Sequence, residues 1–585
     1  MFTRSLRATT PLTGLGQRWF LSMAQTRPNP IVRVLPSLTD LAFLMPIVFL
    51  FARMEGAKTM LGDGDTGWHV RTGEWIIANG RVPDKDVFSF TKAGDPWYAW
   101  EWLWDVTFAW LYSHGGLATV VLASIIVLAV TFVLLLQLLR RRCDNPLIVM
   151  GVTFLACAAS AIHWLARPHL FTMLLTVILM SILDRVQKGR TNLLWLLPPL
   201  TILWTNLHGG FFVEFIILAA FLAGEIARAL FAGEGGERLA ARASAKRYAL
   251  TALGCLAGTF VNPYTYHLHA HIIQFFREPY HIQNIAEYQS ANFHEPAALY
   301  LEFTVLLSMV SAIWFLVKRR DFVPLVLLCG WAHLAVFAAR NVPLFGLVAA
   351  PYIAPAMAEM LEALAEARVA LWVRRTAASF REIGFEFSET DRLWRLHVVS
   401  IAAVVALALL MTSPAATGKL KAEYDPQRYP EKALNLLLAN PQARVFADDE
   451  WGDYLIYKLS PYNHKVFVDG RDDFYGEKFE EKYLDVMTVH YDWEQYLRQY
   501  RIDTVLLSTK SALATVMKES GHWRAVYDDT VAIVFASVPD RAPENQSAST
   551  AAPGVDQRDR RITSAVGRNH KVAAHETSTK RSMTT

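Results

Sequence analysis

Two carboxylates, an imidazole and a guanidinium fall within nine residues near the start of this chain, between Asp63 and Arg71. The segment reads Gly62-Asp63-Gly64-Asp65-Thr66-Gly67-Trp68-His69-Val70-Arg71. Two acids separated by one residue can hold a divalent cation together, or one can act as a general base while the other positions it. The glycines allow the backbone to bring both acids to one point. A solvated acidic turn is the alternative interpretation.

The elements that must position these residues are membrane spans. Of the 585 residues, 53% are hydrophobic and 19% are charged, which is too apolar for an ordinary soluble protein of this length. Apolar blocks of roughly 17–25 residues predict about eleven transmembrane helices, because each block can cross the hydrocarbon core. The predicted spans are 36–53, 117–139, 146–164, 169–186, 192–207, 211–231, 248–264, 299–317, 322–339, 342–358 and 396–413.

Lysine and arginine collect in alternate loops of this pattern. The N-terminal arm, residues 1–35, has five arginines and no acid. The loops after the second and eighth spans begin with Arg140-Arg141-Arg142 and Lys318-Arg319-Arg320. Short basic loops stay in the cytoplasm. We therefore expect a multi-pass protein of the bacterial inner (plasma) membrane with a cytoplasmic N-terminus and with residues 54–116 outside.

Three further segments are predicted not to span the membrane. Residues 97–112 are dense in aromatic side chains and include Glu101 and Asp105, a pattern typical of an amphipathic helix at the interface. One more transmembrane helix is the alternative. Residues 425–537 alternate strand-like runs, among them 465–468, with helical patterns, and predict a soluble extracytoplasmic α/β domain. Residues 539–585 predict a disordered tail.

Polar residues at the outer ends of the spans form a second group of candidates. They are His163, Arg167, His169, Asn206, His208, Asn262, Arg340 and Asn341. Ionisable groups at membrane depth are costly and usually face a protein interior or a wet cavity. We therefore expect a polar cavity that opens outward, in which arginine can bind phosphate through two hydrogen bonds. For any one of these residues, a helix cap or an interhelical hydrogen bond is the alternative.

An acidic cluster lies in the predicted C-terminal domain. Its members are Asp448, Asp449, Asp453, Asp469, Asp472 and Asp473, with Arg471 between them. Part of it follows a predicted strand, where α/β domains often bind ligands. A solvated surface cluster is the alternative. We expect this domain to bind the acceptor or to cap the cavity.

The sequence lacks the motifs of several other classes of function. No Ser-His-Asp spacing, HExxH or GxSxG motif supports hydrolysis by those routes. The four cysteines lie in or beside apolar spans and form no CxxC motif. Basic patches interleaved with aromatic residues, as in nucleic-acid-binding proteins, are also lacking, and we expect no nucleic-acid partner.

The motifs GDGDTGWHVRTGEWIIANGRVPDKDVFSFT, WEWL, ARPHLF, WTNLHGGF, VNPY and ARNVPLF resemble those of bacterial integral-membrane glycosyltransferases of the GT-C superfamily. Protein O-mannosyltransferases and the oligosaccharyltransferase catalytic subunit are distant relatives. The resemblance covers roughly residues 36–537 and implies a GT-C-like transmembrane domain over 36–413. It also implies a sugar donor linked to a polyprenyl phosphate or pyrophosphate, used on the outer face of the membrane.

The resemblance further implies an essential acid in the first outer loop, a role that falls on Asp65 with Asp63 as its partner. It implies that Trp68 and His69 line the sugar site and that Arg167 and Arg340 bind the donor phosphate. The remaining expected substrate-binding residues are Arg71, Glu101, His169, Asn206, His208, Asn262 and Asn341. Relatives differ in their need for metal, so Mg²⁺ or Mn²⁺ at the two acids stays open, and no other cofactor is expected.

The acid would deprotonate or orient an acceptor hydroxyl, which attacks the anomeric carbon and displaces the lipid phosphate with inversion. The acceptor is a glycan, a lipid or a protein, and membrane lipids are further partners. Two alternatives belong to other classes: a transporter or flippase for a lipid-linked or anionic solute, and a non-catalytic membrane assembly protein. A transporter predicts internal repeats and helices broken at the midplane. The polar residues gather at one face instead, which favours the enzyme.

Overall fold

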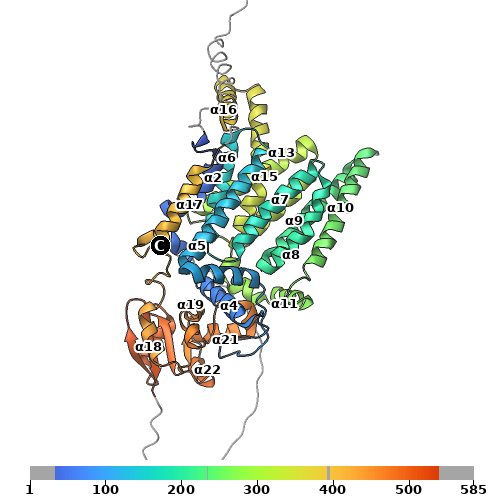
Figure 1. Ribbon diagram of the computed structural model, residues 1–585. Helices are drawn as coiled ribbons and strands as arrows, with labels where there is room; N and C mark the ends of the chain where they lie inside the picture. Colours follow the sequence, from blue (N-terminus) through green and yellow to red (C-terminus); the bar gives the residue numbers. More distant parts are fainter. Residues whose placement is uncertain (1–32, 234, 392–394, 539–585) are drawn as a thin grey trace, which may run out of the picture. The chain divides into compact units, whose positions relative to one another are not determined.

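The computed structural model describes residues 33–233, 235–391 and 395–538. Most of the N-terminal arm and the whole predicted tail, 539–585, lie outside the described residues. The described residues belong to one compact unit that ends at Val538. Figure 1 shows that most of them form helices that run side by side, with a small sheet contributed by the C-terminal part of the unit.

A helix is present at each of the predicted spans. These helices are α2 (Leu38–Arg53), α5 (Trp102–Arg140), α6 (Pro146–Ser160), α7 (His169–Gln187), α8 (Leu197–Leu207), α9 (Phe212–Phe231), α10 (Gly236–Gly258), α13 (Ala298–Arg319), α14 (Phe322–Phe337), α15 (Val342–Glu366) and α17 (Val398–Met411). Within the described residues, six helices are long and apolar enough to cross a membrane, and α14 and α17 are shorter apolar helices. The chain is a multi-pass membrane protein, while the count of eleven crossings stays a prediction.

Polar residues set where several apolar helices begin. At α2, the Ser37 hydroxyl accepts a hydrogen bond from the Asp40 backbone N–H, and the Asp40 carboxylate accepts one from the Ser37 N–H, which is a capping box. At α6, the Asn145 side chain accepts from the first backbone N–H groups of the helix. The helices then pack through buried apolar faces, with α5 against α2 and α7, and α15 against α6 and α13.

The predicted interface helix over 97–112 is the first part of α5. It begins at Trp102 and is separated from the apolar part by a kink at Gly115 and Gly116. Gly116 has φ of +63°, which glycine adopts without steric cost. The segment is therefore a distinct helical piece ahead of the span, and its location at a membrane surface stays a prediction.

Shorter helices lie at one end of the helical bundle. They are α3 (Ala57–Met60), α4 (Asp65–Asn79), α11 (Tyr266–Arg277) and α12 (Pro279–Asn284), and α16 (Leu371–Asp391) follows α15. Helix α4 packs along α5 and also contacts the C-terminal segment. The residues that carry the predicted chemistry therefore sit where the helical bundle meets that segment.

The C-terminal segment contains a four-stranded mixed sheet in the order β1-β2-β4-β3. Strand β1 pairs with β2 in parallel, and β4 pairs antiparallel with both β2 and β3. The strands are β1 (Val445–Ala447), β2 (Thr504–Ser508), β3 (Trp523–Asp528) and β4 (Ala532–Ser537). The helices are α18 (Leu434–Ala439), α19 (Asp449–Leu459), α20 (Asp472–Tyr475), α21 (Glu477–Met487), α22 (Trp493–Gln499) and α23 (Ala512–Glu519).

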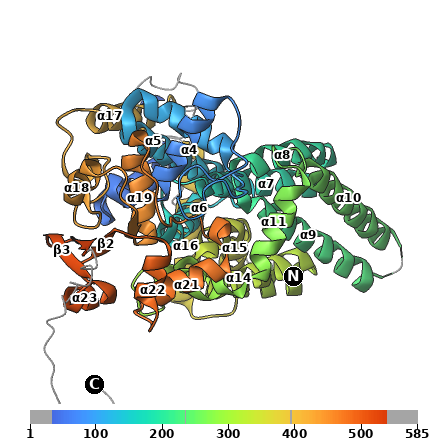
Figure 2. The same cartoon turned by 90° about the horizontal axis from the view of Figure 1, so that it is seen from below.

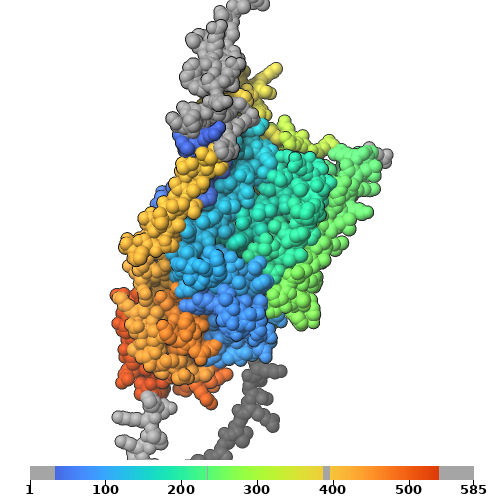
Figure 3. Space-filling model, viewed as in Figure 1, coloured from blue at the N-terminus to red at the C-terminus, as the bar shows by residue number. Residues whose placement is uncertain are grey.

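One predicted strand does not join this sheet. Residues 465–468 form only an isolated parallel bridge, between Val466 and Ser89 of the first outer loop. The backbone of residues 465–468 thus joins the C-terminal segment to that loop through hydrogen bonds. Figure 2 shows α19 beside α4, and in Figure 3 the orange surface of the C-terminal segment meets the blue surface of the first outer loop.

Candidate functional site

The glycine-rich decapeptide is a turn that becomes a helix, since α4 begins at Asp65. Its glycines provide space rather than unusual backbone angles. Gly64 has helical angles, and a Cβ atom there would lie 2.5 Å from the Asp453 Cβ and 2.6 Å from the Glu450 carbonyl oxygen. A Cβ at Gly67 would lie 2.6 Å from the Tyr457 Cβ. The glycines thus let α19 pack directly onto α4, which corrects the prediction that they serve backbone freedom.

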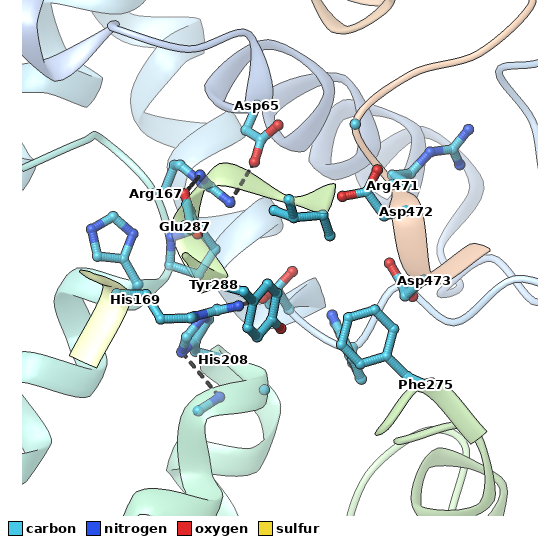
Figure 4. A pocket seen from close by; sticks show the side chains of 18 of the residues that line it. Asp65, Arg167, His169, His208, Phe275, Glu287, Tyr288, Arg471, Asp472 and Asp473 are labelled. Atoms are coloured by element: carbon cyan, nitrogen blue, oxygen red, sulfur yellow. Dashed lines mark hydrogen bonds and ion pairs between the residues drawn. The ribbon is translucent and has the colours of Figure 1, made fainter. Parts of the chain in front are cut away.

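One guanidinium joins three carboxylates at the start of α4. Arg167 lies between Asp63, Asp65 and Glu287, with nitrogen–oxygen distances of 2.8, 2.5 and 3.0 Å respectively. Arg167 precedes α7, and Glu287 belongs to the short 3₁₀ turn Ala286–Tyr288. Figure 4 shows the Arg167 side chain between Asp65 and Glu287. Three separated parts of the chain therefore meet at a single cation.

The three carboxylates respond differently to this environment. Burial raises the pKa of Asp63 to about 7 and also raises the pKa of Asp65, although the positive charge of Arg167 acts in the opposite direction on both. Burial also opposes ionisation of Glu287, but Arg167, His163 and Arg340 together hold its pKa at about 2. Glu287 is thus ionised at neutral pH.

A fourth carboxyl group, Asp453 of α19, reaches Asp65 from the C-terminal segment. The two side chains are hydrogen bonded to one another, and the Gly470 N–H donates to Asp453 Oδ1 at 2.8 Å. Burial, and then the negative charge of Asp65, raise the pKa of Asp453 well above its usual range. We therefore assign the shared proton to Asp453, which donates to the Asp65 carboxylate.

Aromatic and imidazole rings lie beside these acids. The Trp68 Nε1–H donates to Asp65 Oδ1 at 3.4 Å, and the Trp68 ring stacks on His69 with centroids 3.7 Å apart. His69 Nδ1 is 2.7 Å from Asp105 Oδ1, and its Nε2 is 3.8 Å from Glu101 Oε2. Burial raises the pKa of Glu101 to about 8 and lowers that of His69 well below its usual value.

These side chains line a cavity of about 510 Å³. Another part of the cavity wall is apolar and comes from α9, α11, α12, α14 and the turns beside them. Its side chains are Phe212, Ile216, Ile272, Phe275, Phe276, Ile282, Ile285, Leu334 and Phe337. Arg340 also lines the cavity, with its guanidinium 4.5 Å from the centroid of the Tyr288 ring. Among the described residues, no carboxylate forms an ion pair with Arg340.

Most of the predicted site residues converge here. The residues that line the cavity are Asp63, Asp65, Trp68, His69, Glu101, Arg167, His169, His208, Arg340 and Asn341. That these side chains bind substrate stays a prediction. Polar residues from separate span ends do line one cavity, but the cavity expected to be polar is lined by apolar side chains as well.

Three predicted residues lie elsewhere and make local bonds instead. Arg71 donates to the Tyr457 carbonyl oxygen at 2.7 Å and so joins α4 to α19. Asn206 accepts from Trp102 Nε1 at 2.8 Å. Asn262 accepts from the Tyr264 N–H at 2.8 Å within a turn. The alternative interpretation of an interhelical hydrogen bond holds for Asn206, which joins α8 to α5, whereas Asn262 stabilises a turn between helices.

Two groups of residues line the cavity although they were not among the predicted substrate-binding residues. One is the acidic cluster of the C-terminal segment, of which Asp449, Asp453, Asp472 and Asp473 line the cavity together with the neighbouring Glu450. Its sequence signal was present, but acidic surface clusters are common. The other is Glu287 with Tyr288, which lies in a polar stretch without a recognisable motif. Arg471 is buried against Asp469 and Asp86, at 2.6 and 2.8 Å, and ties this cluster to the first outer loop.

Asp63 and Asp65, the residues expected to hold a divalent cation, both form ion pairs with Arg167. Among the described residues, no group of three or more His, Cys, Asp or Glu side chains is arranged as a metal site. Asp63 Oδ1 is buried and has no hydrogen-bond partner. The acids could thus supply part of a coordination shell, with ligands to be completed by a bound substrate.

Comparison with solved structures relates the fold to a membrane enzyme. The apo oligosaccharyltransferase of Archaeoglobus fulgidus aligns over 91% of this chain and 76% of its own, with 12% identity and a TM-score of 0.50. ArnT from Cupriavidus metallidurans, bound to undecaprenyl phosphate, aligns over 86% of this chain and 98% of its own, with 12% identity and a TM-score of 0.40. No protein-family model and no curated protein sequence matches the chain. The first alignment shows that the fold of this chain is similar to that of the oligosaccharyltransferase.

Proposed function

We propose that this GT-C-fold chain transfers a sugar from a polyprenyl-phosphate-linked donor to an acceptor on the outer face of the bacterial inner membrane. The observation that carries the proposal is the combination of three environments in one cavity. These are the acids around Asp65, the cation Arg340 and the apolar wall that includes Phe275 and Phe337. A lipid-linked sugar phosphate has three matching parts, namely a polar sugar, an anion and a hydrocarbon chain.

The arrangement suggests where each part of the donor lies. The hydrocarbon chain packs on the apolar wall, where Phe276 and Phe337 are half exposed, at 49% and 50%. The donor phosphate binds Arg340, since that guanidinium makes no ion pair among the described side chains. Arg167 is engaged by three carboxylates, so its role is to position Asp65 rather than to bind the phosphate alone. The sugar then lies against Trp68 and His69.

The chemistry follows from this placement. Asp65 Oδ2 is fixed by Arg167, and its Oδ1 faces Trp68. Asp65 accepts the proton of an acceptor hydroxyl while the hydroxyl oxygen forms a bond to the anomeric carbon. The bond between that carbon and the phosphate oxygen breaks, and the phosphate leaves with the electron pair. Attack from the face opposite the phosphate inverts the anomeric carbon, and positioning together with charge stabilisation lowers the barrier.

A divalent cation, Mg²⁺ or Mn²⁺, fits the acid excess of this cavity and is part of the proposal. Asp63 and Asp65 would hold it, with Asp63 Oδ1 available as a ligand. Mg²⁺ is commonly bound by one or two carboxylates together with substrate phosphates, so a closed set of protein ligands is not required. Such an ion would stabilise negative charge on the departing phosphate.

The experiment that tests the proposal uses the full-length protein in lipid nanodiscs with a panel of radiolabelled polyprenyl-phosphate sugars and membrane extract as the acceptor source. Release of the lipid phosphate together with transfer of label to an acceptor supports the proposal. EDTA is expected to stop transfer, and added Mg²⁺ or Mn²⁺ to restore it. Transfer that is unchanged in EDTA would show that no divalent cation is needed, while the proposal of a glycosyltransferase would stand.

The matched variants are Asp65→Asn and Asp84→Asn, which both change an aspartate of the first outer loop. Asp84 is 66% exposed and pairs with Arg81 at the surface. We expect Asp65→Asn to lower transfer by about 100-fold or more and Asp84→Asn to leave it unchanged. Equal activity of the two variants would refute the assignment of Asp65.

A further inference from the structure

A second cavity, of about 620 Å³, lies at the other ends of the helices that line the first. Helix α7 starts at His169 in the first cavity, and Asp184 and Gln187 in its last turn line the second. Helix α9 likewise contributes Phe212 to the first cavity and Arg228 to the second. The 19 residues of α7 rise by about 28 Å, close to the hydrocarbon thickness of about 30 Å. The two cavities therefore open at opposite ends of the bundle.

This cavity is lined by an excess of positive charge. Seven Lys or Arg side chains line it, against five Asp or Glu side chains. The basic residues are Arg141, Arg142, Lys188, Arg228, Arg247, Arg319 and Arg320. One buried carboxylate, Asp184, pairs with Arg142 at 2.7 Å, with Lys188 at 3.2 Å and with Arg141 at 3.4 Å, and a second, Glu225, pairs with Arg228 at 2.7 Å. One negative charge cannot neutralise three cations. Positive charge is therefore in excess around Asp184 as well as over the whole cavity lining.

Several donors in this cavity have no acceptor. Arg141 Nη2 and Arg228 Nε are buried without a hydrogen-bond partner. Within the described ranges, neither Arg247 nor Arg320 takes part in an ion pair. Buried charged donors are normally hydrogen bonded, because an unsatisfied one loses its solvation without compensation. Both the charge excess and the unused donors therefore call for an anion with several acceptor oxygens.

We infer that the second cavity binds a phosphate group, carried either by an anionic lipid or by a soluble phosphate. Phosphate presents acceptor oxygens that match the paired N–H groups of arginine. The cavity stands about one hydrocarbon thickness from the first, at the level where the phosphates of one leaflet lie. Basic pockets between transmembrane helices at this level bind lipid head groups. This inference does not depend on the proposed glycosyl transfer.

The test uses full-length protein with two probes. In the first arm, nanodiscs of phosphatidylcholine with or without phosphatidylglycerol are analysed by native mass spectrometry for retained phosphatidylglycerol. In the second arm, inorganic phosphate is titrated onto protein in phosphatidylcholine nanodiscs, and the melting temperature is followed. Retention of the lipid without an effect of phosphate assigns the site to a lipid head group, and the reverse assigns it to a soluble phosphate.

The variants change cations that make no ion pair, so the fold should persist. For the probe that binds, Arg247→Gln combined with Arg320→Gln is expected to weaken binding by about tenfold or more. Arg242→Gln, an exposed arginine of the same helix α10 that does not line the cavity, should change binding less than twofold. If the double variant misfolds, Arg320→Gln alone replaces it. Binding by neither probe, or equal binding by the double variant and wild type, would overturn the inference.

Discussion

Asp65 makes contact with charged or polar groups from separate parts of the chain. Arg167 comes from the junction before α7, Asp453 from α19, and Trp68 from the next turn of α4 itself. The sequence was sufficient to select Asp65 and Arg167, because acids and arginines at span ends stand out against apolar surroundings. It was not sufficient to pair Asp65 with Asp453, since the contact spans almost 400 residues, about two thirds of the chain, and depends on the space left by Gly64.

The first prediction concerns the proton shared by Asp65 and Asp453. Asp453→Ala removes the protonated carboxyl group that donates to Asp65 and should slow transfer by about 100-fold. Because both residues act on one proton, the double variant with Asp65→Asn should be no slower than Asp65→Asn alone. Asp528→Ala, at an exposed acid of β3, serves as the control. Rate losses that multiply in the double variant would show that the two residues act independently.

The second prediction concerns the Glu287 carboxylate. Its pKa in the folded state is about 2, below the ordinary value of 4.5, so its ion pair with Arg167 stabilises the fold above pH 4.5. That stabilisation is lost as the pH falls toward 2. The melting temperature of Glu287→Gln should therefore lie below that of wild type at neutral pH, and the gap should narrow as the pH drops below about 4.5. Glu295→Gln, at an exposed position of the same loop, should show no such gap.

At the scale of elements, hydropathy predicted where helices form, because each span must bury its backbone hydrogen bonds within itself. It predicted the boundaries of α2, α7 and α13 to within a few residues. Hydropathy did not predict which part of the chain residues 465–468 pair with. An apolar, β-branched run favours a strand, but whether it joins a sheet or bridges to Ser89 is decided by tertiary contacts.

The contact between α4 and α19 carries the third prediction. Gly64→Ala places a methyl group against Asp453 and the Glu450 carbonyl oxygen and should force the two helices apart. We expect a destabilisation of about 1–3 kcal/mol and a loss of transfer, measured by thermal unfolding and by the nanodisc assay. Gly521→Ala, in the same C-terminal segment with no atom within 4 Å of the added Cβ, is the control. Unchanged activity of Gly64→Ala would show that this close packing does not support the site.

At the scale of the whole molecule, the first outer loop, the outer ends of the helices and the C-terminal segment together build one cavity. Composition predicted the membrane class, and the shared side of the polar span ends predicted a cavity there. The sequence predicted that the C-terminal domain binds the acceptor or caps the cavity, but it left a solvated acidic cluster open, since that cluster has the same composition. One cavity that gathers acids, a cation and an apolar wall favours the proposed enzyme over a flippase or an assembly protein.

The most direct test is mass spectrometry of surface glycans, glycolipids and glycoproteins from a strain that lacks this protein. Complementation with wild type or Asp84→Asn is predicted to restore a sugar that is missing from one of these classes. Asp65→Asn, expressed at the same level in the membrane, is predicted not to restore it. Full restoration by Asp65→Asn, or surface glycans that are identical with and without the protein, would contradict the account.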